Sequence, residues 1–343
     1  MPDQLIYAME VFLNGLMAGV MYALVALGFV LIFKASGIFN FAQGVMALFA
    51  AMTLVGIQTG QVPFYHLINA VFGTNIHYFG WEIHSIIAII FTVVVMIGLA
   101  WAVQRFIFKH LVGQEPIILF MATIGLAYLL EGVADLMWGS EIKKLDVCLT
   151  DTTCLPQGIN LAIDEATFNV FGYGFFIDNL DITATIIAIL LVAVLVAFSQ
   201  YTKQGRAMRA VADDHQAALS VGVSLNYIWI LVWSVAGFVA LVAGIMWGAK
   251  SGVQFSLSLI ALKALPVLML GGFTSIPGAI VGGLIIGVGE KLFEFFMSSN
   301  DLSGALFGFT MNATENWFAY VLALIFLVFR PQGLFGEKII ERV

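Results

Sequence analysis

The chain has 343 residues, of which 61% are apolar and 10% are charged, whereas a soluble domain carries about a quarter charged residues. A single soluble core cannot hide this much apolar surface, so the composition excludes an ordinary soluble protein and indicates one embedded in lipid. The net charge of −7 identifies no partner, because the position of each charge matters more than the sum. We predict an all-α, polytopic helical membrane protein in which residues 1–343 form a single transmembrane domain.

Nine apolar runs approach the roughly 20 residues that a membrane-spanning helix needs. In chain order they cover about 9–33, 39–58, 84–108, 117–138, 182–199, 226–249, 257–272, 276–297 and 317–329. The seventh run is short and contains Lys263 and Pro266, so we expect a broken or re-entrant element there. The ninth run is also short. The sequence therefore predicts eight or nine transmembrane segments, of which one or two are broken or re-entrant.

Basic residues favour one side of this arrangement. Lys263 and Lys291 lie within or close to apolar runs, and only Lys143, Lys144 and Lys250 fall on the side that also holds the N-terminus. The remaining Lys and Arg residues fall in or beside loops on the other side. Loops rich in Lys and Arg stay cytoplasmic, so we expect the N-terminus outside and the C-terminus inside.

The longest polar segment, residues 139–181, is then a periplasmic loop, and it contains Cys148 and Cys154. In an oxidising periplasm these two cysteines can form a disulfide, and the alternative is a pair of free thiols. No nearby histidine completes a zinc site, so we expect no metal.

Two Gly-rich, polar segments, residues 36–44 and 271–278, interrupt the apolar pattern. Irregular backbone at membrane depth must be buried or line a cavity, and interrupted segments in transporters point to the central pathway. The alternative is a tight turn between neighbouring helices. We favour the turn for 271–278, and both interpretations stay open for 36–44. The candidate pathway residues, which all carry hydrogen-bonding or ionisable groups, are Asn40, Gln43, Thr123, Glu131 and Lys263.

Ionisable residues inside a membrane are costly and suggest function. Glu131 lies one helical turn from Asp135, and one hypothesis is an ion pair between Lys263 and Glu131 that holds two helices together. A second cluster toward the end of the eighth run is expected to extend to the membrane interface; it consists of Glu290, Lys291 and Glu294. The same run has two Gly-x-x-x-Gly spacings, at 278/282 and 283/287, which predict close helix packing.

The loop between the fifth and sixth runs, residues 200–225, is not a random hydrophilic connector. Small or apolar residues recur in it at helical spacing, with a polar interruption near Asp213 and Asp214. Either aspartate can cap a following helix, and Gly222 is placed to end that helix. We expect two short helices on the cytoplasmic surface. Two interpretations stay open: a docking site for a partner protein, or an amphipathic helix lying flat on the membrane.

This loop contains Gly205-Arg206-Ala207-x-Arg209-Ala210 and then Gln216-Ala217-Ala218-x-x-x-Gly222. The pattern resembles the cytoplasmic coupling loop of ATP-binding cassette (ABC) importer permeases, and more specifically that of the branched-chain (hydrophobic) amino acid ABC transporter permease family. Gln216 departs from the acidic residue that is usual in the family. Three further segments and the closing motif resemble the family in the same order: residues 15–44, 122–126, 270–279 and 330–336.

The resemblance implies the transmembrane permease subunit of an ABC importer for branched-chain amino acids or related small solutes, in a bacterial inner membrane. It implies ATP-binding cassette subunits, a second permease that is identical or homologous, and a periplasmic solute-binding protein as partners. The residues expected to couple to the ATPase lie in the loop 200–225; they are Gly205, Arg206, Arg209, Asp213, Asp214, Ala217, Ala218 and Gly222.

The chain has no phosphate-binding loop and no basic tract for nucleic acid. We therefore expect no ATPase site of its own, no enzymatic activity, no cofactor and no nucleic-acid partner. The alternative function is an ion- or proton-coupled secondary transporter acting alone, with Glu131, Asp135 and Lys263 as the coupling charges.

Overall fold

The computed structural model describes residues 2–74, 76–79, 83–111, 114–145, 167–170, 173–176, 179–213, 215–298 and 315–336. Within these ranges, six helices are long and apolar enough to cross a membrane, and three shorter apolar helices accompany them. The prediction of a polytopic helical membrane protein is therefore confirmed.

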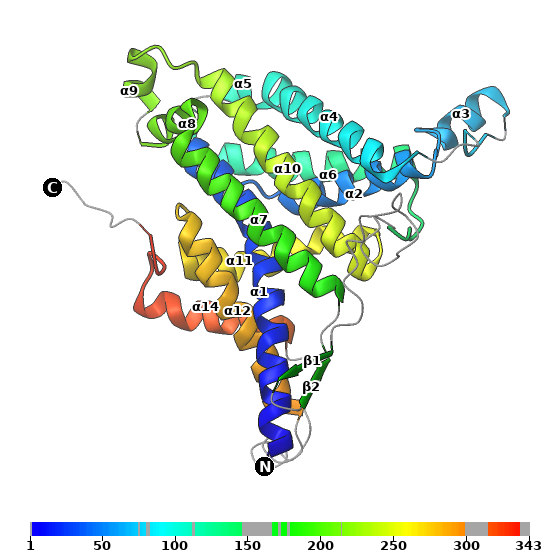
Figure 1. Cartoon of the computed structure of the whole chain (residues 1–343). Helices are drawn as coiled ribbons and strands as arrows, with labels where there is room; N and C mark the ends of the chain where they lie inside the picture. The colour runs from blue at the N-terminus through cyan, green and yellow to red at the C-terminus, as the bar shows by residue number, and fades with distance from the viewer. Residues whose placement is uncertain are drawn as a thin grey trace.

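The helices follow the predicted apolar runs closely, with short elements between them (Figure 1). In chain order they are α1 (Pro2–Ser36), α2 (Gln43–Gln58), α3 (Tyr65–Phe72), α4 (Ser85–Val103), a π-helical turn η1 (Gln104–Phe108), α5 (Lys109–Leu111), α6 (Pro116–Trp138), α7 (Asn179–Tyr201), α8 (Lys203–Asp213), α9 (His215–Ser220), α10 (Leu225–Ser251), a 3-10 turn η2 (Phe255–Leu259), α11 (Ile260–Gly271), α12 (Ile276–Ser298) and α14 (Glu315–Phe329).

Two short strands lie in the segment predicted as a periplasmic loop, and the sequence analysis did not predict them. β1 (Thr167–Val170) pairs antiparallel with β2 (Tyr173–Phe176), and Thr167 lies opposite Phe176. β2 also contacts α1. The all-α prediction is therefore correct for the membrane domain but incomplete for this loop.

The bundle has two distinct ends. One end, which we call the α8 end, carries α8, α9 and the turn between α11 and α12; the opposite end, the hairpin end, carries the start of α1 and the β1–β2 hairpin (Figure 1). The closing segment Arg330–Gly336 belongs to the α8 end, because the amide of Phe335 donates to the carbonyl of Gly271 at 3.1 Å.

Burial separates central helices from peripheral ones. The most apolar 18-residue windows of α1 and α10 are 78% and 72% buried, whereas those of α4 and α7 are only 28% buried. α1 and α10 therefore form the centre of the bundle, and α4 and α7 lie at its periphery with much of their apolar surface exposed.

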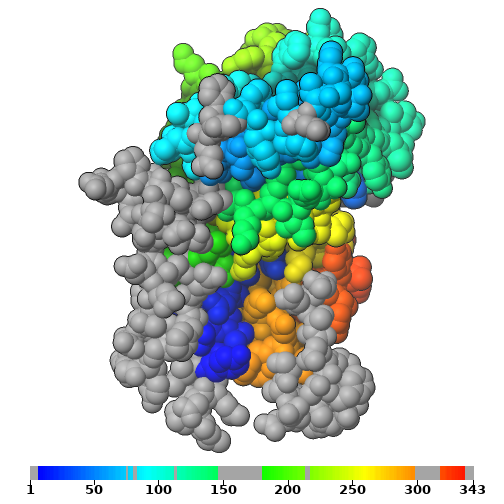
Figure 2. All heavy atoms as spheres, turned by 90° about the vertical axis from the view of Figure 1, so that its right-hand side faces the viewer, coloured from blue at the N-terminus to red at the C-terminus, as the bar shows by residue number. Residues whose placement is uncertain are grey.

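Glycines bring α1 and α12 into close contact, and the two helices lie side by side (Figures 1 and 2). A Cβ atom on Gly19 would lie 2.6 Å from the carbonyl oxygen of Gly283, and one on Gly283 would lie 2.6 Å from that of Gly19. Only residues without a side chain permit this separation. The close packing predicted from the 283/287 spacing is confirmed.

The seventh predicted span is irregular, as expected. It begins as η2 and continues as α11, which contains Pro266. Proline cannot donate to the carbonyl four residues earlier, which here belongs to Leu262. The hydroxyl of Tyr320, on α14, donates to that carbonyl oxygen at 2.7 Å, so a neighbouring helix satisfies the group that the proline leaves open.

Candidate functional site

The loop 200–225 folds into two short helices, as predicted, and specific contacts fix the first of them. The hydroxyl of Thr202 accepts from the amide of Gly205 at 2.9 Å and so caps the start of α8. Gly205 packs against the backbone of Phe198 and Ser199, and no side chain fits between them. Gly205 thus allows α8 to fold back tightly against the end of α7.

The end of α9 has the geometry of a glycine C-cap. Gly222 has a φ of +88°, which residues with a side chain rarely adopt. Its amide donates to the carbonyl of Leu219 at 3.0 Å, and the amide of Val223 donates to that of Ala218 at 3.0 Å. This is a Schellman motif, so Gly222 ends α9 as the sequence predicted.

α8 and α9 have an inward face and an outward face. The buried residues of the inward face are Met208, Val211 and Ala218, and α8 contacts α1, α7 and α10. The apolar face of α8 packs against the bundle, so this face is not available to lie on the membrane surface. The outward face carries Arg206, Ala217, Leu219 and Val221, and we call it the α8–α9 surface.

The α8–α9 surface leaves apolar side chains exposed. Val221 is 83% exposed and Leu219 is 51% exposed. Arg209, in contrast, is half-buried and turns toward α7, where it donates to the carbonyl of Gln200 at 3.4 Å. Asp213 is the last residue of α8, whereas Asp214 lies outside the described residues, so the predicted acidic cap is not tested.

Three of the predicted pathway residues meet around the segment 37–42 between α1 and α2, which we call the break. Asn40, Gln43 and Thr123 are all buried. The hydroxyl of Thr123 accepts from the amide of Phe41 at 3.1 Å and lies 2.8 Å from the carbonyl of Phe120, to which it donates. Thr123, on α6, thus stabilises the irregular backbone of the break by hydrogen bonding.

Asn40 and Gln43 complete this network with their amide groups. The side chain of Asn40 accepts from the amide of Ala42 at 3.1 Å and donates to the oxygen of Gln43 at 3.2 Å. Gln43 donates to the carbonyl of Ala236, on α10, at 3.3 Å. The polar groups of the break are therefore bonded to the chain itself, as buried polar groups require.

After the break, the chain starts α2 inside the bundle and not at its end. This explains why α2 is short. Gln43 packs against Gly28, which lies two turns, or about 12 Å, before the end of α1. The next residue, Gly44, packs against the carbonyl of Ser258 in η2. The break and η2, both irregular, therefore meet inside the bundle. Segment 271–278 instead forms the turn between α11 and α12 at the α8 end, as we favoured.

The structure contradicts the hypothesis that Lys263 pairs with Glu131. The amino group of Lys263 lies 3.3 Å from the carboxylate of Glu290, and the hydroxyl of Tyr22 lies 3.4 Å from the same carboxylate oxygen. Glu290 is 1% exposed, so it does not extend to the membrane interface as expected. Lys291 and Glu294, which pair at 3.2 Å, are partly exposed.

The cluster of Tyr22, Lys263 and Glu290 joins α1, α11 and α12, and Tyr22 also stacks on Trp247 of α10 with ring centroids 5.7 Å apart. The roles of Tyr22 and Glu290 were not predicted from the sequence. A signal was present, because Glu290 lies three residues after Gly287, which packs on α1. That spacing places Glu290 on the same helix face, directed toward α1.

The remaining predicted residues do not join these groups. Glu131 is half-buried and Asp135 is exposed on α6. Cys148 and Cys154 lie outside the described residues, so their pairing stays a prediction. Among the residues that the structure describes, no three His, Cys, Asp or Glu side chains cluster closely enough to hold a metal ion.

Comparisons with known proteins agree with this architecture. The profile of the family described as branched-chain amino acid transport system / permease component matches residues 11–328. The high-affinity branched-chain amino acid transport system permease protein LivH of Escherichia coli (strain K12) is 24% identical over 100% of both chains. The corresponding protein BraD of Pseudomonas aeruginosa is 27% identical, again over 100% of both chains.

A more distant relative is the ribose import permease protein RbsC of Haemophilus influenzae, which is 25% identical over 60% of this chain and 72% of its own length. No solved structure matches the chain significantly. Since the family profile covers most of the sequence, the chain belongs to the family of permease components of branched-chain amino acid transport systems.

Proposed function

We propose that this chain is the transmembrane permease subunit of an ABC importer in a bacterial inner membrane, and that it carries branched-chain amino acids or related small solutes. Family membership supports the solute class. The single observation that carries the mechanism is the α8–α9 surface, a helix pair capped at Thr202 and Gly222 with exposed apolar side chains. Contiguous exposed apolar groups beside a polar rim suit the docking of a partner.

ATP hydrolysis takes place in the partner, and its energy enters the permease mechanically. The ATP-binding subunit contacts Arg206, Ala217 and the rest of the α8–α9 surface, while Gly205 and Gly222 fix the shape of the two helices. α8 contacts α1, α7 and α10, so a displacement of α8 reaches the centre of the bundle directly.

The solute passes near the level of the break and the Lys263–Glu290 pair. Ionisable residues within a membrane are costly, and the buried Glu290 pairs with the half-buried Lys263 where α1, α11 and α12 meet. Asn40, Gln43 and Thr123 act in this scheme by holding the break that shapes the pathway. Glu131, half-buried on α6, is a further candidate for a residue that lines the solute pathway.

The other partners follow from the two ends of the bundle. The loop 139–181 faces the periplasm and receives the solute-binding protein, and the loop 200–225 faces the cytoplasm. A second permease, identical or homologous, completes the pathway between the two subunits. The whole chain acts as one transmembrane permease domain.

The ion pair between the half-buried Lys263 and the buried Glu290 also favours a second candidate, an ion- or proton-coupled carrier that acts alone. Reconstitution into liposomes with and without the ATP-binding subunit distinguishes the two. For the importer, uptake of radiolabelled leucine requires ATP and the partner, and a protonophore leaves it unchanged while ATP is held constant. Uptake by the chain alone that collapses with the protonophore would establish the carrier instead.

A further inference from the structure

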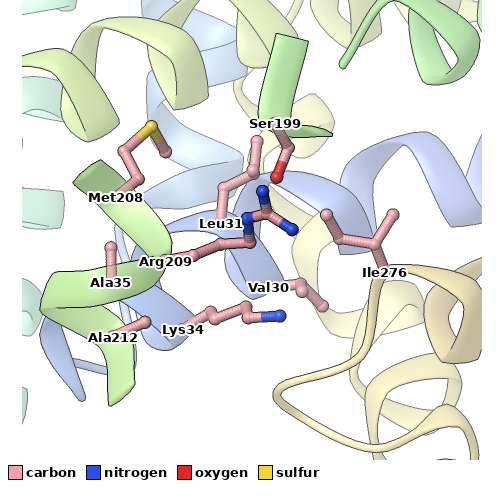
Figure 3. Close-up of a pocket in the computed structure, with 9 residues that line it drawn as sticks. All are labelled: Val30, Leu31, Lys34, Ala35, Ser199, Met208, Arg209, Ala212 and Ile276. Carbon is pink, nitrogen blue, oxygen red and sulfur yellow. The ribbon is translucent and has the colours of Figure 1, made fainter. Parts of the chain in front are cut away.

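A pocket at the α8 end is lined by two basic side chains from different helices. Lys34, in the last turn of α1, and Arg209, on α8, both line it. Figure 3 shows the charged ends of the two side chains pointing in the same direction, toward Ile276 at the start of α12. The hydroxyl of Ser199, on α7, lies beside the guanidinium group in the same view. Four helices thus contribute to one pocket.

Among the described residues, no acidic side chain lines this region. An adjoining pocket is also lined by Lys34 and Arg209, together with Ser199, Gln200, Thr274 and Ser275, and within the described part of the chain neither pocket has an Asp or Glu in its wall. Neither cation forms an ion pair with a carboxylate among the residues that the structure describes. Two adjacent positive charges with hydroxyl groups beside them favour a bound anion.

Apart from Lys34, Arg209 and Ser199, the walls of the first pocket are apolar. Val30, Leu31 and Ile276 line it, and they come from helices that span the membrane or begin at its surface. The basic residues of the α8 end place that end on the cytoplasmic side. Basic pockets between transmembrane helices on this side bind the headgroups of anionic phospholipids.

We propose that Lys34 and Arg209 bind the phosphate group of an anionic phospholipid from the cytoplasmic leaflet. Ser199 donates a hydrogen bond to the phosphate, and the apolar wall contacts the adjoining part of the acyl chains. The lipid lies against α8 and thereby holds this helix to α1 and α7. The inference requires only that the chain is embedded in a membrane, so it is independent of the transport activity.

Native mass spectrometry of the purified full chain tests this site. Dioleoyl phosphatidylglycerol, dioleoyl phosphatidylcholine and inorganic phosphate are added separately, and the dissociation constant of the first bound molecule is measured for each. The wild type is expected to bind phosphatidylglycerol most tightly. The double variant Lys34→Gln/Arg209→Gln should weaken that binding about 30-fold and leave the binding of phosphatidylcholine unchanged.

Two further variants separate loss of the site from loss of charge or of folding. Arg105→Gln/Lys109→Gln removes two exposed charges elsewhere on the chain and should retain the preference. Lys34→Arg/Arg209→Lys keeps both charges and should also retain it.

Four results would overturn the proposal. These are equal binding of the two lipids to the wild type, equal losses in both double Gln variants, binding of inorganic phosphate as tight as that of phosphatidylglycerol, and loss of the bound lipid when the measurement is repeated with the ATP-binding subunit present. The third result would indicate that Lys34 and Arg209 bind a soluble anion. The fourth would indicate that they pair with a carboxylate of the ATP-binding subunit.

Discussion

The break and the α8–α9 surface both lie in short segments between membrane-length helices, but they differ in which side chains are buried and which are exposed. In the break, the side chains of Asn40, Gln43 and Thr123 are buried and bonded to neighbouring helices. On the α8–α9 surface, backbone groups are capped locally by Thr202 and Gly222, and apolar side chains face outward.

This difference separates a structural role from a docking role. A segment whose polar groups are all paired within the chain needs no partner, and its hydrogen bonds stabilise the fold. A segment that is well ordered but leaves apolar groups exposed contributes little to stability and is available for a partner. Substitutions in the bundle interior should therefore change stability, and substitutions on the α8–α9 surface should change binding.

The largest effect on stability is expected at the Lys263–Glu290 pair. In Lys263→Met, the carboxylate of Glu290 remains buried without its ammonium partner, and losing one member of a buried pair costs about 3–5 kcal/mol. The double variant Lys263→Met/Glu290→Gln removes both charges and should recover most of this loss. The free energy of unfolding in detergent measures both. A double variant no more stable than Lys263→Met would show that the two residues act independently.

A smaller loss of stability is expected when the break loses its threonine. Thr123→Val leaves the partly buried amide of Phe41 without its acceptor, which costs about 1 kcal/mol, the low end of the range for an unsatisfied buried group. The chain offers a matched control in Thr53, whose buried hydroxyl has no hydrogen-bond partner in the described part of the structure. Thr53→Val should be neutral or slightly stabilising. Equal thermal shifts for the two variants would contradict the role assigned to Thr123.

The glycine cap of α9 should contribute about 1 kcal/mol to the stability of α9 and little to that of the rest of the bundle. Gly222→Ala places a side chain at a φ of +88° but meets no atom within 4 Å, so the cost is the backbone strain alone. Gly222→Asn should cost less, because asparagine tolerates this conformation better. Amide hydrogen exchange is expected to speed up in α9 and to stay unchanged in α1. Faster exchange throughout the bundle would refute a local role.

The smallest expected effect is a shifted titration of Lys143, which follows α6. Lys143 donates to the carbonyl of Trp138 at 2.8 Å and also to Gln61. Burial disfavours the ammonium form and lowers the pKa of Lys143 from 10.5 to about 8. The neutral, reactive amine should therefore appear with a midpoint near pH 8. Acylation of Lys143, followed by mass spectrometry from pH 7 to 10, checks this, and a midpoint above pH 10 would contradict it.

Local patterns in the sequence predicted the elements well, and long-range pairing much less well. Apolar runs, the irregular seventh span, the helix pair of the loop 200–225 and the glycine contact of α12 all follow from residues close together in sequence. The partner of Lys263 does not, because it depends on which helices become neighbours in the folded bundle. Glu131 and Glu290 were both plausible by charge, and only the packing of α12 against α1 and α11 selects Glu290.

The break shows a second limit of the sequence. Its glycine and polar residues indicate irregular backbone, but they do not distinguish a segment inside the bundle from a tight turn at its end. The packing of Gln43 against Gly28 places it inside the bundle. The β1–β2 hairpin was missed because it lies in a polar segment whose sequence was assigned only as a loop.

The most direct test of the central claim is whether the α8–α9 surface binds the ATP-binding subunit. Leu219→Asp/Val221→Asp replaces its two exposed apolar side chains, and Val71→Asp/Ile142→Asp is a matched control, since these side chains are 67% and 71% exposed outside the α8–α9 surface. The affinity of each purified chain for the ATP-binding subunit is measured with the thermal stability of each chain. We expect at least a tenfold loss for the first variant, which corresponds to about 1.4 kcal/mol, with unchanged stability and no loss for the control. Unchanged affinity in the first variant would contradict the docking role of the α8–α9 surface.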